Sequence, residues 1–337
     1  MSQQIDIAVD LGVVPPPLPE ILTLRQLVEI APAAPPQIIE GVLHVRSKMI
    51  LGGTSKSNKS WCLLDLAISV ASGSDWWGRR CTKMSVLYIN FELHAWAIAQ
   101  RLNSVAAARP ECKGMGDTLH IWNLRGHNAD LTLLRPKLEE QLDRHQFGMI
   151  ILDPAYKVLG NRDENANGDI ASLMNEFEAL VQRTGAALVV AHHFAKGDST
   201  VKSVIDRMSG AVAWARDPDS ILVLTPHEEE ECFTVSTVLR NLPRVDDFVV
   251  RWDYPRMLLA KDLNPDALRR PQSKNKVCTD REFVEAYVGR SPVGRKVIVE
   301  MAAEDGISAR TADRYLQRLV ECELICSSGG LYWRKES

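Results

Sequence analysis

Ten residues near the start of the chain combine glycine, lysine and hydroxyl groups at a spacing suited to binding phosphate. Residues 51–60 read LGGTSKSNKS, with a short apolar run at 48–51 before the glycines and a largely apolar run at 61–71 afterwards. The first run is typical of a buried parallel strand and the second of a helix packed against a sheet. A strand, a glycine-rich turn and a helix in this order direct backbone N–H groups and the positive end of the helix dipole at one anion. We therefore predict a phosphate-binding loop.

The loop departs at one position from the pattern G-x-x-x-x-G-K-[ST]. Asn58 stands where the second glycine is usual, between Gly53 and the pair Lys59-Ser60. That glycine serves a turn that can require positive φ, which asparagine tolerates better than most residues. In this pattern Lys59 reaches the terminal phosphates and the Ser60 hydroxyl binds Mg²⁺, whereas the alternative is an ordinary strand-to-helix turn. The predicted nucleotide-binding residues are Gly53, Thr54, Ser55, Lys56, Ser57, Asn58, Lys59, Ser60 and Trp61.

Two acidic residues follow later apolar strands. Glu92 comes after the strand predicted at 84–91, and Asp153 ends the most apolar one, at 147–152. Ligands gather at the carboxyl ends of the strands of an open α/β sheet. There Glu92 could orient the water that attacks a γ-phosphate, and Asp153, in a Walker B position, could hold Mg²⁺ together with Ser60. The alternatives are a first-turn helix acid for Glu92 and a turn residue for Asp153.

A further strand, predicted at 186–191, ends in His192-His193. A side chain at this position can hydrogen-bond a γ-phosphate or the attacking water. Adjacent residues on a strand point to opposite faces, so the two rings are not expected to bind one metal ion. We expect one histidine to face the nucleotide and the other the sheet surface.

Composition limits the class of protein. A chain of 337 residues has room for two domains, and 45% hydrophobic with 25% charged residues is usual for a globular protein. A net charge of −3 leaves nucleic-acid contacts to local patches. Seven cysteines without C-x-x-C pairs argue against a disulfide framework or a zinc site. No signal peptide and no apolar run of about 20 residues are recognisable, which predicts a cytoplasmic protein without membrane contact.

The chain divides into four predicted segments. Residues 1–37 form a proline-rich arm, which either packs on the main domain or a neighbouring subunit or is a loosely ordered tail. An α/β domain spans 38–262, and alternating polarity at 233–239 and 248–252 predicts antiparallel edge strands. A polar, basic linker covers 263–279, and a helical unit covers 280–337.

The last segment has the pattern of a winged helix-turn-helix. Helices are predicted at 280–288, 293–304 and 309–325, with Ser308 capping the third and a hairpin turning at Gly329-Gly330. The buried stripe expected on the third helix comprises Thr311, Tyr315, Leu316, Leu319 and Val320. The basic residues on or near its other face are Arg310, Arg314 and Arg318. These arginines predict DNA contact, and protein contact or oligomer assembly is the alternative.

Taken together, the motifs resemble those of the RecA/DnaB-type P-loop ATPases, AAA-family ATPases in the broad sense, and most of all the RepA-like replicative helicases of plasmids and phages. The resemblance covers roughly residues 38–260. The matching stretches are 51–60, 86–92, 150–153, 189–193 with Lys196-Gly197, and 207–216. It implies a RecA-like P-loop NTPase core with a mostly parallel sheet and antiparallel edge strands, ATP and Mg²⁺ as ligands, and a hexameric ring with ATP between subunits.

The resemblance also implies roles for single residues. Glu92 would activate water, Asp153 would be the Walker B residue, and either His192 or His193 would be the strand-end sensor. Arg216 is the first choice for an arginine finger from the neighbouring subunit and Arg207 the second, with a structural ion pair as the alternative for both. The loops after the Asp153 and His193 strands would face a central channel. Their expected contacts to single-stranded phosphates are Lys157, Arg162, Lys196 and Lys202.

The sequence therefore predicts a ring-forming, Mg²⁺-dependent ATPase, a DNA helicase or translocase in the replication of a plasmid, phage or mobile element. Single-stranded DNA would pass through the ring, and duplex DNA is an option at the winged unit. The alternative is an ATP-gated, DNA-binding recombination mediator or regulator with slow turnover, which Asn58 would suit. A metabolic kinase is disfavoured, because it has no use for a winged helix or an arginine finger.

Overall fold

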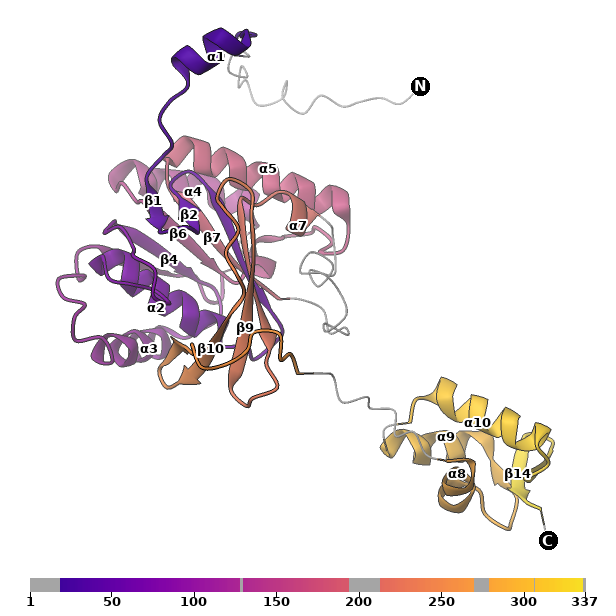
Figure 1. The fold of residues 1–337 in the computed structure, drawn as a ribbon. Helices are drawn as coiled ribbons and strands as arrows, with labels where there is room; N and C mark the ends of the chain where they lie inside the picture. Colours follow the sequence, from indigo (N-terminus) through magenta and orange to yellow (C-terminus); the bar gives the residue numbers. More distant parts are fainter. Residues whose placement is uncertain (1–18, 128–129, 194–212, 270–278, 306, 336–337) are drawn as a thin grey trace.

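A computed structural model describes residues 19–127, 130–193, 213–269, 279–305 and 307–335 (Figure 1). The predicted site residues Lys196, Lys202 and Arg207 lie outside these ranges. Within them, no helix is both long enough and apolar enough to cross a membrane.

A nine-stranded sheet forms the core of the large domain. Its strands are β3 (Lys48–Gly53), β4 (Val86–Asn90), β5 (Leu119–Asn123), β6 (Met149–Asp153), β7 (Ala187–His193), β8 (Ser220–Pro226), β9 (Cys232–Leu239), β10 (Phe248–Asp253) and β11 (Arg256–Leu259). They lie in the order β11-β10-β9-β8-β3-β7-β6-β4-β5. The six strands from β8 to β5 in this order are parallel, and β9, β10 and β11 continue the sheet as antiparallel strands. The mostly parallel sheet predicted for an α/β P-loop core is confirmed.

The register brings the ends of the predicted motif strands to one edge. In the pair β3–β7, Gly53 lies opposite His193, and in the pair β4–β6, Asn90 lies opposite Asp153. All four residues are the last of their parallel strands. The edge formed by these carboxyl ends is therefore where a ligand of the glycine-rich loop would meet the later motifs.

Helices cover both faces of this sheet (Figure 1). On one face lie α2 (Lys59–Ser72) and α3 (Ala95–Ala107), and on the other α4 (Leu131–Arg144), α5 (Asn167–Thr184) and the short α7 (Ala213–Arg216). The alternation along β3 sends Met49 and Leu51 into the core beneath α2, and Ile50 into the core beneath α5. A strand whose two faces are both covered is expected to be apolar, as residues 49–51 are, whereas Lys48 at its start is buried in ion pairs with Glu178 and Asp217.

The chain enters this domain through a short hairpin. β1 (Gln37–Ile39) pairs antiparallel with β2 (Leu43–His44). Before it, α1 (Leu24–Ile30) has a capping box between Thr23 and Gln26, and none of its residues is buried. The N-terminal arm thus contains a short helix, held by its own cap.

At the far end of the sheet, the packed chain extends further than the sequence predicts. The hydroxyl of Thr234 donates to the carbonyl of Pro265 at 2.9 Å, and Arg269 N donates to Pro226 O at 3.0 Å. Residues 264–269, placed in the linker from their polar composition, hydrogen-bond to β8 and β9. Composition alone did not reveal these backbone contacts.

The C-terminal unit is built from α8 (Asp280–Tyr287), β12 (Val293–Gly294), α9 (Arg295–Glu304), α10 (Ala309–Glu321), β13 (Ile325–Ser328) and β14 (Leu331–Arg334). The three strands form an antiparallel sheet in the order β12-β14-β13. Its helices pack around a core of their own that includes Phe283, Ile298 and Leu316. The hairpin turns at Gly329 and Gly330, both at positive φ, as predicted.

Two details predicted for α10 are wrong, although its cap is correct. The side chain of Ser308 accepts from Thr311 N, as expected of an N-cap. The helix ends at Glu321, not at 325, because Glu323 adopts φ +54° and Ile325 already belongs to β13. Ala312, not Thr311, occupies the buried stripe, since the Thr311 hydroxyl instead bonds that of Ser308 at 2.8 Å.

Candidate nucleotide-binding site

The glycine-rich loop joins β3 to α2 through left-handed backbone. Asn58 lies at φ +57°, ψ 24°, and Lys56 at φ +65°. Asn58 is also the N-cap of α2, yet its side chain makes no capping hydrogen bond. The position where glycine is usual therefore has the positive φ that the sequence predicts. Asparagine suits this position because it tolerates left-handed backbone, and not because of a capping contact of its side chain.

Gly53 is required for a different reason, the close approach of neighbouring atoms. A Cβ at this position would lie 2.7 Å from Ser57 Oγ, 3.1 Å from Leu224 O and 3.2 Å from Leu224 Cβ. Leu224 belongs to β8, beside β3, so its carbonyl cannot move away without disturbing the sheet. The loop is thus packed against the neighbouring strand at its first residue.

The Lys59 side chain lies inside the loop. Its ammonium donates to the carbonyls of Gly53 and Thr54, both at 2.9 Å, and to Ser57 Oγ at 3.3 Å. Burial lowers the pKa of Lys59 to about 8, against the opposing charges of Asp153, Cys62 and Glu92. The loop therefore gathers a cation at the positive end of α2, which suits the terminal phosphates of a nucleotide.

Asp153 is buried at the end of β6 and its carboxylate is hydrogen-bonded. The Tyr88 hydroxyl donates to Asp153 Oδ2 at 2.6 Å. Burial raises the pKa of Asp153, while hydrogen bonds from Tyr88 and Ser60 lower it. The hydrogen bond between Ser60 and Asp153 places a hydroxyl and a carboxylate together, which are the oxygen ligands that Mg²⁺ prefers, so the residues present fit this ion.

Glu92 lies beyond β4 with its backbone fixed and its side chain exposed. Asn90 Oδ1 accepts from Glu92 N at 3.3 Å, and Arg125 Nη1 donates to Glu92 O at 2.7 Å. The carboxylate itself accepts a hydrogen bond from the Tyr156 hydroxyl. Burial, followed by this hydrogen bond, raises the pKa of Tyr156 to about 12.

The two histidines at the end of β7 lie in different surroundings. His192 is 2% exposed and stacks on Trp214 of α7, with the ring centroids 4.1 Å apart. His193 is only half-buried, and its ring centroid is 6.4 Å from that of Tyr156. Burial lowers the pKa of both, that of His192 to about 3, and the charge of Lys59 contributes in each case. Of the two, His193 is the one beside the Glu92–Tyr156 pair.

An aromatic group lies beside the first turn of α2. The Trp61 ring contacts those of Trp252 and Tyr254, each with centroids 5.6 Å apart, and the Arg101 guanidinium lies 4.7 Å from the Trp61 centroid. Tyr254 is 63% exposed. The exposed ring of Tyr254, held against Trp61 next to Ser60, is suited to stack on a flat base.

A comparison with known families agrees with this geometry. A family model described as an AAA domain matches residues 15–199, more than half of the chain. The chain belongs to this AAA-domain family. The matched range contains the loop from Gly53 to Ser60 together with Glu92, Asp153 and both histidines. Membership in the AAA-domain family supports an ATP-binding P-loop ATPase, in line with the ligand inferred from the loop.

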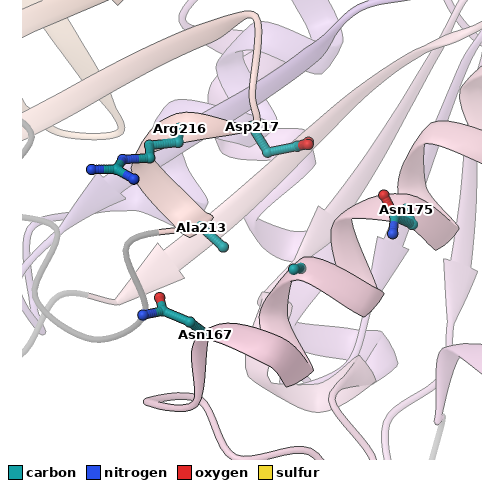
Figure 2. Close-up of a pocket in the computed structure, with 6 residues that line it drawn as sticks. Asn167, Asn175, Ala213, Arg216 and Asp217 are labelled. Carbon is teal, nitrogen blue, oxygen red and sulfur yellow. The ribbon is translucent and has the colours of Figure 1, made fainter.

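Arg216 of this AAA-domain protein lies on the opposite face of the sheet from α2. It ends α7 and borders a hollow of 470 Å³ lined by Asn167, Ala171, Asn175, Ala213, Arg216 and Asp217 (Figure 2). Figure 2 shows its exposed side chain pointing away from Asp217 and α5. The next residue, Asp217, pairs with Lys48 at the start of β3, whereas the loop begins at Gly53 at the other end of that strand, so Arg216 lies away from the loop of its own chain.

The predicted nucleic-acid contacts differ from one another in their surroundings. Lys157 is exposed, with its ammonium 4.9 Å from the Tyr156 ring centroid. Arg162 pairs with Asp130 at 3.3 Å and with Glu176, which favours a structural role that links α4 and α5. Lys157 is thus better placed than Arg162 to meet a nucleic acid.

The arginines of α10 also differ. Arg310 and Arg314 are exposed, and neither forms an ion pair within the described part of the chain. Arg318 pairs with Asp280 and lies 4.8 Å from the Tyr315 ring centroid. Arg310 and Arg314 are thus better placed than Arg318 to meet an anionic partner.

Sequence reasoning missed three tyrosines of this site. Tyr88 lies inside β4, Tyr156 follows Asp153 by three positions, and Tyr254 comes from a turn almost 200 positions after the loop. A signal existed for Tyr156, which stands next to the predicted Lys157. Tyr88 looked like an ordinary strand residue, and only the pairing of β4 with β6 reveals its partner Asp153.

Proposed function

We propose that this AAA-domain protein is a Mg²⁺-dependent ATPase that works on DNA, as a ring-forming helicase or translocase of a plasmid, phage or mobile element. One observation carries the proposal: a buried lysine in a glycine-rich loop, a buried strand-end aspartate and an exposed glutamate converge at one sheet edge. The charges of Asp153 and Glu92 both act on the pKa of Lys59, which reflects their proximity.

The chemistry would rest on positioning and electrostatics, as in other phosphoryl transfers. Lys59 would exchange the loop carbonyls of Gly53 and Thr54 for phosphate oxygens. Ser60 and Asp153 would hold Mg²⁺, which neutralises phosphate charge when bound. Glu92 would orient the attacking water, and His193 would stand near the terminal phosphate. Asp153 is buried and Glu92 exposed, so the two carboxylates suit different tasks.

Two further parts would complete the ATP site. The exposed ring of Tyr254, against Trp61, would stack on the base. The guanidinium of Arg216 would come from a neighbouring subunit and stabilise the transition state. Its location across the sheet from α2 supports this role in trans, and a hexameric ring would supply such neighbours.

The C-terminal unit supports the choice of DNA. The order α8, β12, α9, α10, β13, β14 is that of a helix-turn-helix followed by a hairpin wing, and we propose that it is a winged helix. Its second helix-turn-helix element, α10, exposes Arg310 and Arg314. An exposed basic helix of this kind binds phosphates and can read a groove.

A second function has an observation in its favour. The Glu92 carboxylate is engaged by Tyr156, and a carboxylate held in this way is less free to orient water. Slow turnover would suit an ATP-gated DNA-binding mediator or regulator. DNA-dependent acceleration of hydrolysis distinguishes the motor from this switch.

The test is steady-state ATP hydrolysis with and without single-stranded DNA, for wild type, Lys59→Ala and Glu92→Gln. A motor is expected to show DNA-stimulated turnover that falls by about 100-fold or more in both variants, since each removes a charged group from the transition state. Lys137→Ala, on the exposed surface of α4, is the matched control. No turnover in wild type, with nucleotide binding lost in Lys59→Ala, would refute the motor and leave the switch.

A further inference from the structure

The contact between Glu92 and Tyr156 joins two elements with different tasks. Glu92 follows β4, and Tyr156 lies in the 3-10 helix η2 (Ala155–Val158), directly after β6. The Tyr156 hydroxyl donates to Glu92 Oε1. Within the described ranges, no other side chain hydrogen-bonds to this carboxylate. Since Asn90 and Arg125 already fix the Glu92 backbone, Tyr156 decides where the carboxylate points.

The helix η2 is anchored at its ends and exposed between them. Ala155 and Val158 are completely buried in the core on the α5 face. Tyr156 is 40% exposed, and Lys157 beside it is exposed as well. The Lys157 ammonium lies 4.9 Å from the Tyr156 ring centroid, which is close enough for a cation–π contact. A ligand that attracts Lys157 therefore acts on the orientation of the tyrosine ring.

We propose that Tyr156 is a positioning residue that holds Glu92 away from the attacking water until nucleic acid engages Lys157. This role rests on the proposed function and explains how DNA would stimulate ATP hydrolysis. A carboxylate that accepts a phenol hydrogen bond has that oxygen occupied and cannot accept from water in the same direction. Phosphates of a single strand attract Lys157 from the ring face. Tyr156 then leaves Glu92, and the carboxylate becomes free to orient water.

Tyr156→Phe tests this directly, because it keeps the ring and removes only the hydroxyl. A hydrogen bond to a charged group, taken at the lower end because the pair is partly exposed, predicts a rise in DNA-free turnover of about tenfold. The DNA-stimulated rate and the KM for ATP should stay within about twofold of wild type. The ratio of the DNA-stimulated rate to the DNA-free rate should therefore fall. The matched control is Tyr287→Phe, which removes another phenol–carboxylate hydrogen bond, to Asp305 Oδ2 at 2.6 Å, in the C-terminal unit.

Two double variants establish the route of the effect. Tyr156→Phe combined with Glu92→Gln should lose the elevated turnover, since the released group is the Glu92 carboxylate. Lys157→Gln should weaken stimulation by DNA, whereas Tyr156→Phe with Lys157→Gln should keep the elevated DNA-free rate. A readout without nucleotide is the Cζ resonance of ¹³C-labelled tyrosine, which Glu92→Gln should shift at Tyr156 and leave unchanged at Tyr287.

The outcomes separate this inference from the proposed function. If wild type is stimulated by DNA but Tyr156→Phe has the same DNA-free rate, the restraint by Tyr156 is refuted and the motor stands. If Tyr156→Phe hydrolyses ATP faster while no DNA stimulates the wild type, the restraint by Tyr156 stands, whereas its release by nucleic acid and the motor are both refuted. An increase that persists in the Glu92→Gln background would also overturn the proposal, because the effect would not pass through Glu92.

Discussion

Asn58 offers the sharpest test of the nucleotide-binding loop, because its backbone conformation and its side-chain contacts make separate predictions. The residue has φ +57° and its side chain makes no cap hydrogen bond. Left-handed backbone is unfavourable by roughly 1–2 kcal/mol for an ordinary residue and by less for asparagine. Glycine has no such penalty, but the greater conformational freedom of its unfolded chain lowers the free energy of unfolding by about 0.5–1 kcal/mol.

These magnitudes predict opposite outcomes for two small substitutions. Asn58→Gly should leave the free energy of unfolding within about 0.5 kcal/mol of wild type, since no capping bond is lost and the backbone suits glycine. Asn58→Ala should be about 1 kcal/mol less stable, because alanine keeps the cost of positive φ. A loop that relaxes in the alanine variant would also misdirect its N–H groups, and ATP affinity should fall about fivefold to tenfold.

Denaturant unfolding followed by tryptophan fluorescence measures the first effect, because every tryptophan except Trp333 precedes the C-terminal unit. Titration with a fluorescent ATP analogue measures the second. Asn103→Ala, at an exposed position within α3, is the control and should be neutral or slightly stabilising, as alanine favours helix. Equal stability and affinity for Asn58→Ala and Asn58→Gly would refute the left-handed turn.

Two other predictions concern the buried charges of the site. Burial lowers the pKa of Lys59 to about 8, so the positive charge of its ammonium is lost as pH rises through that value. The affinity for ATP should therefore fall between pH 7 and 9. The same pH dependence in a Lys59→Ala protein would contradict this prediction. Tyr88→Phe removes a donor from buried Asp153, which should cost roughly 1.5–3 kcal/mol in unfolding free energy and raise the pKa of Asp153 further. The Mg²⁺ concentration needed for hydrolysis should then rise, more at pH 6 than at pH 8, and an unchanged Mg²⁺ titration would count against the contact.

Patterns within short stretches of sequence predicted those parts of the site that are built from consecutive residues. The loop before α2 and the acid after β6 each depend on about ten residues, and their strand context follows from hydrophobicity alone. Contacts between elements could not be predicted in this way. Arg162 looked like a free cation in a polar loop, but the fold brings Asp130 and Glu176 to it. Tyr156 meets Glu92 only because β4 and β6 are neighbours in the sheet.

The division of the sheet into two faces bears on why such a protein would need a second copy of itself. Strand alternation directs Met49 and Leu51 of β3 to the α2 face, and Gly53 continues that series at the loop. The helix α7 packs instead on the α5 face, where Trp214 is completely buried. Arg216, at the end of α7, precedes Asp217, which pairs with Lys48 at the start of β3, and so lies away from the loop at the end of that strand. Any part it plays in hydrolysis requires the α5 face of one subunit to meet the loop edge of another, so catalysis and assembly would depend on the same contact.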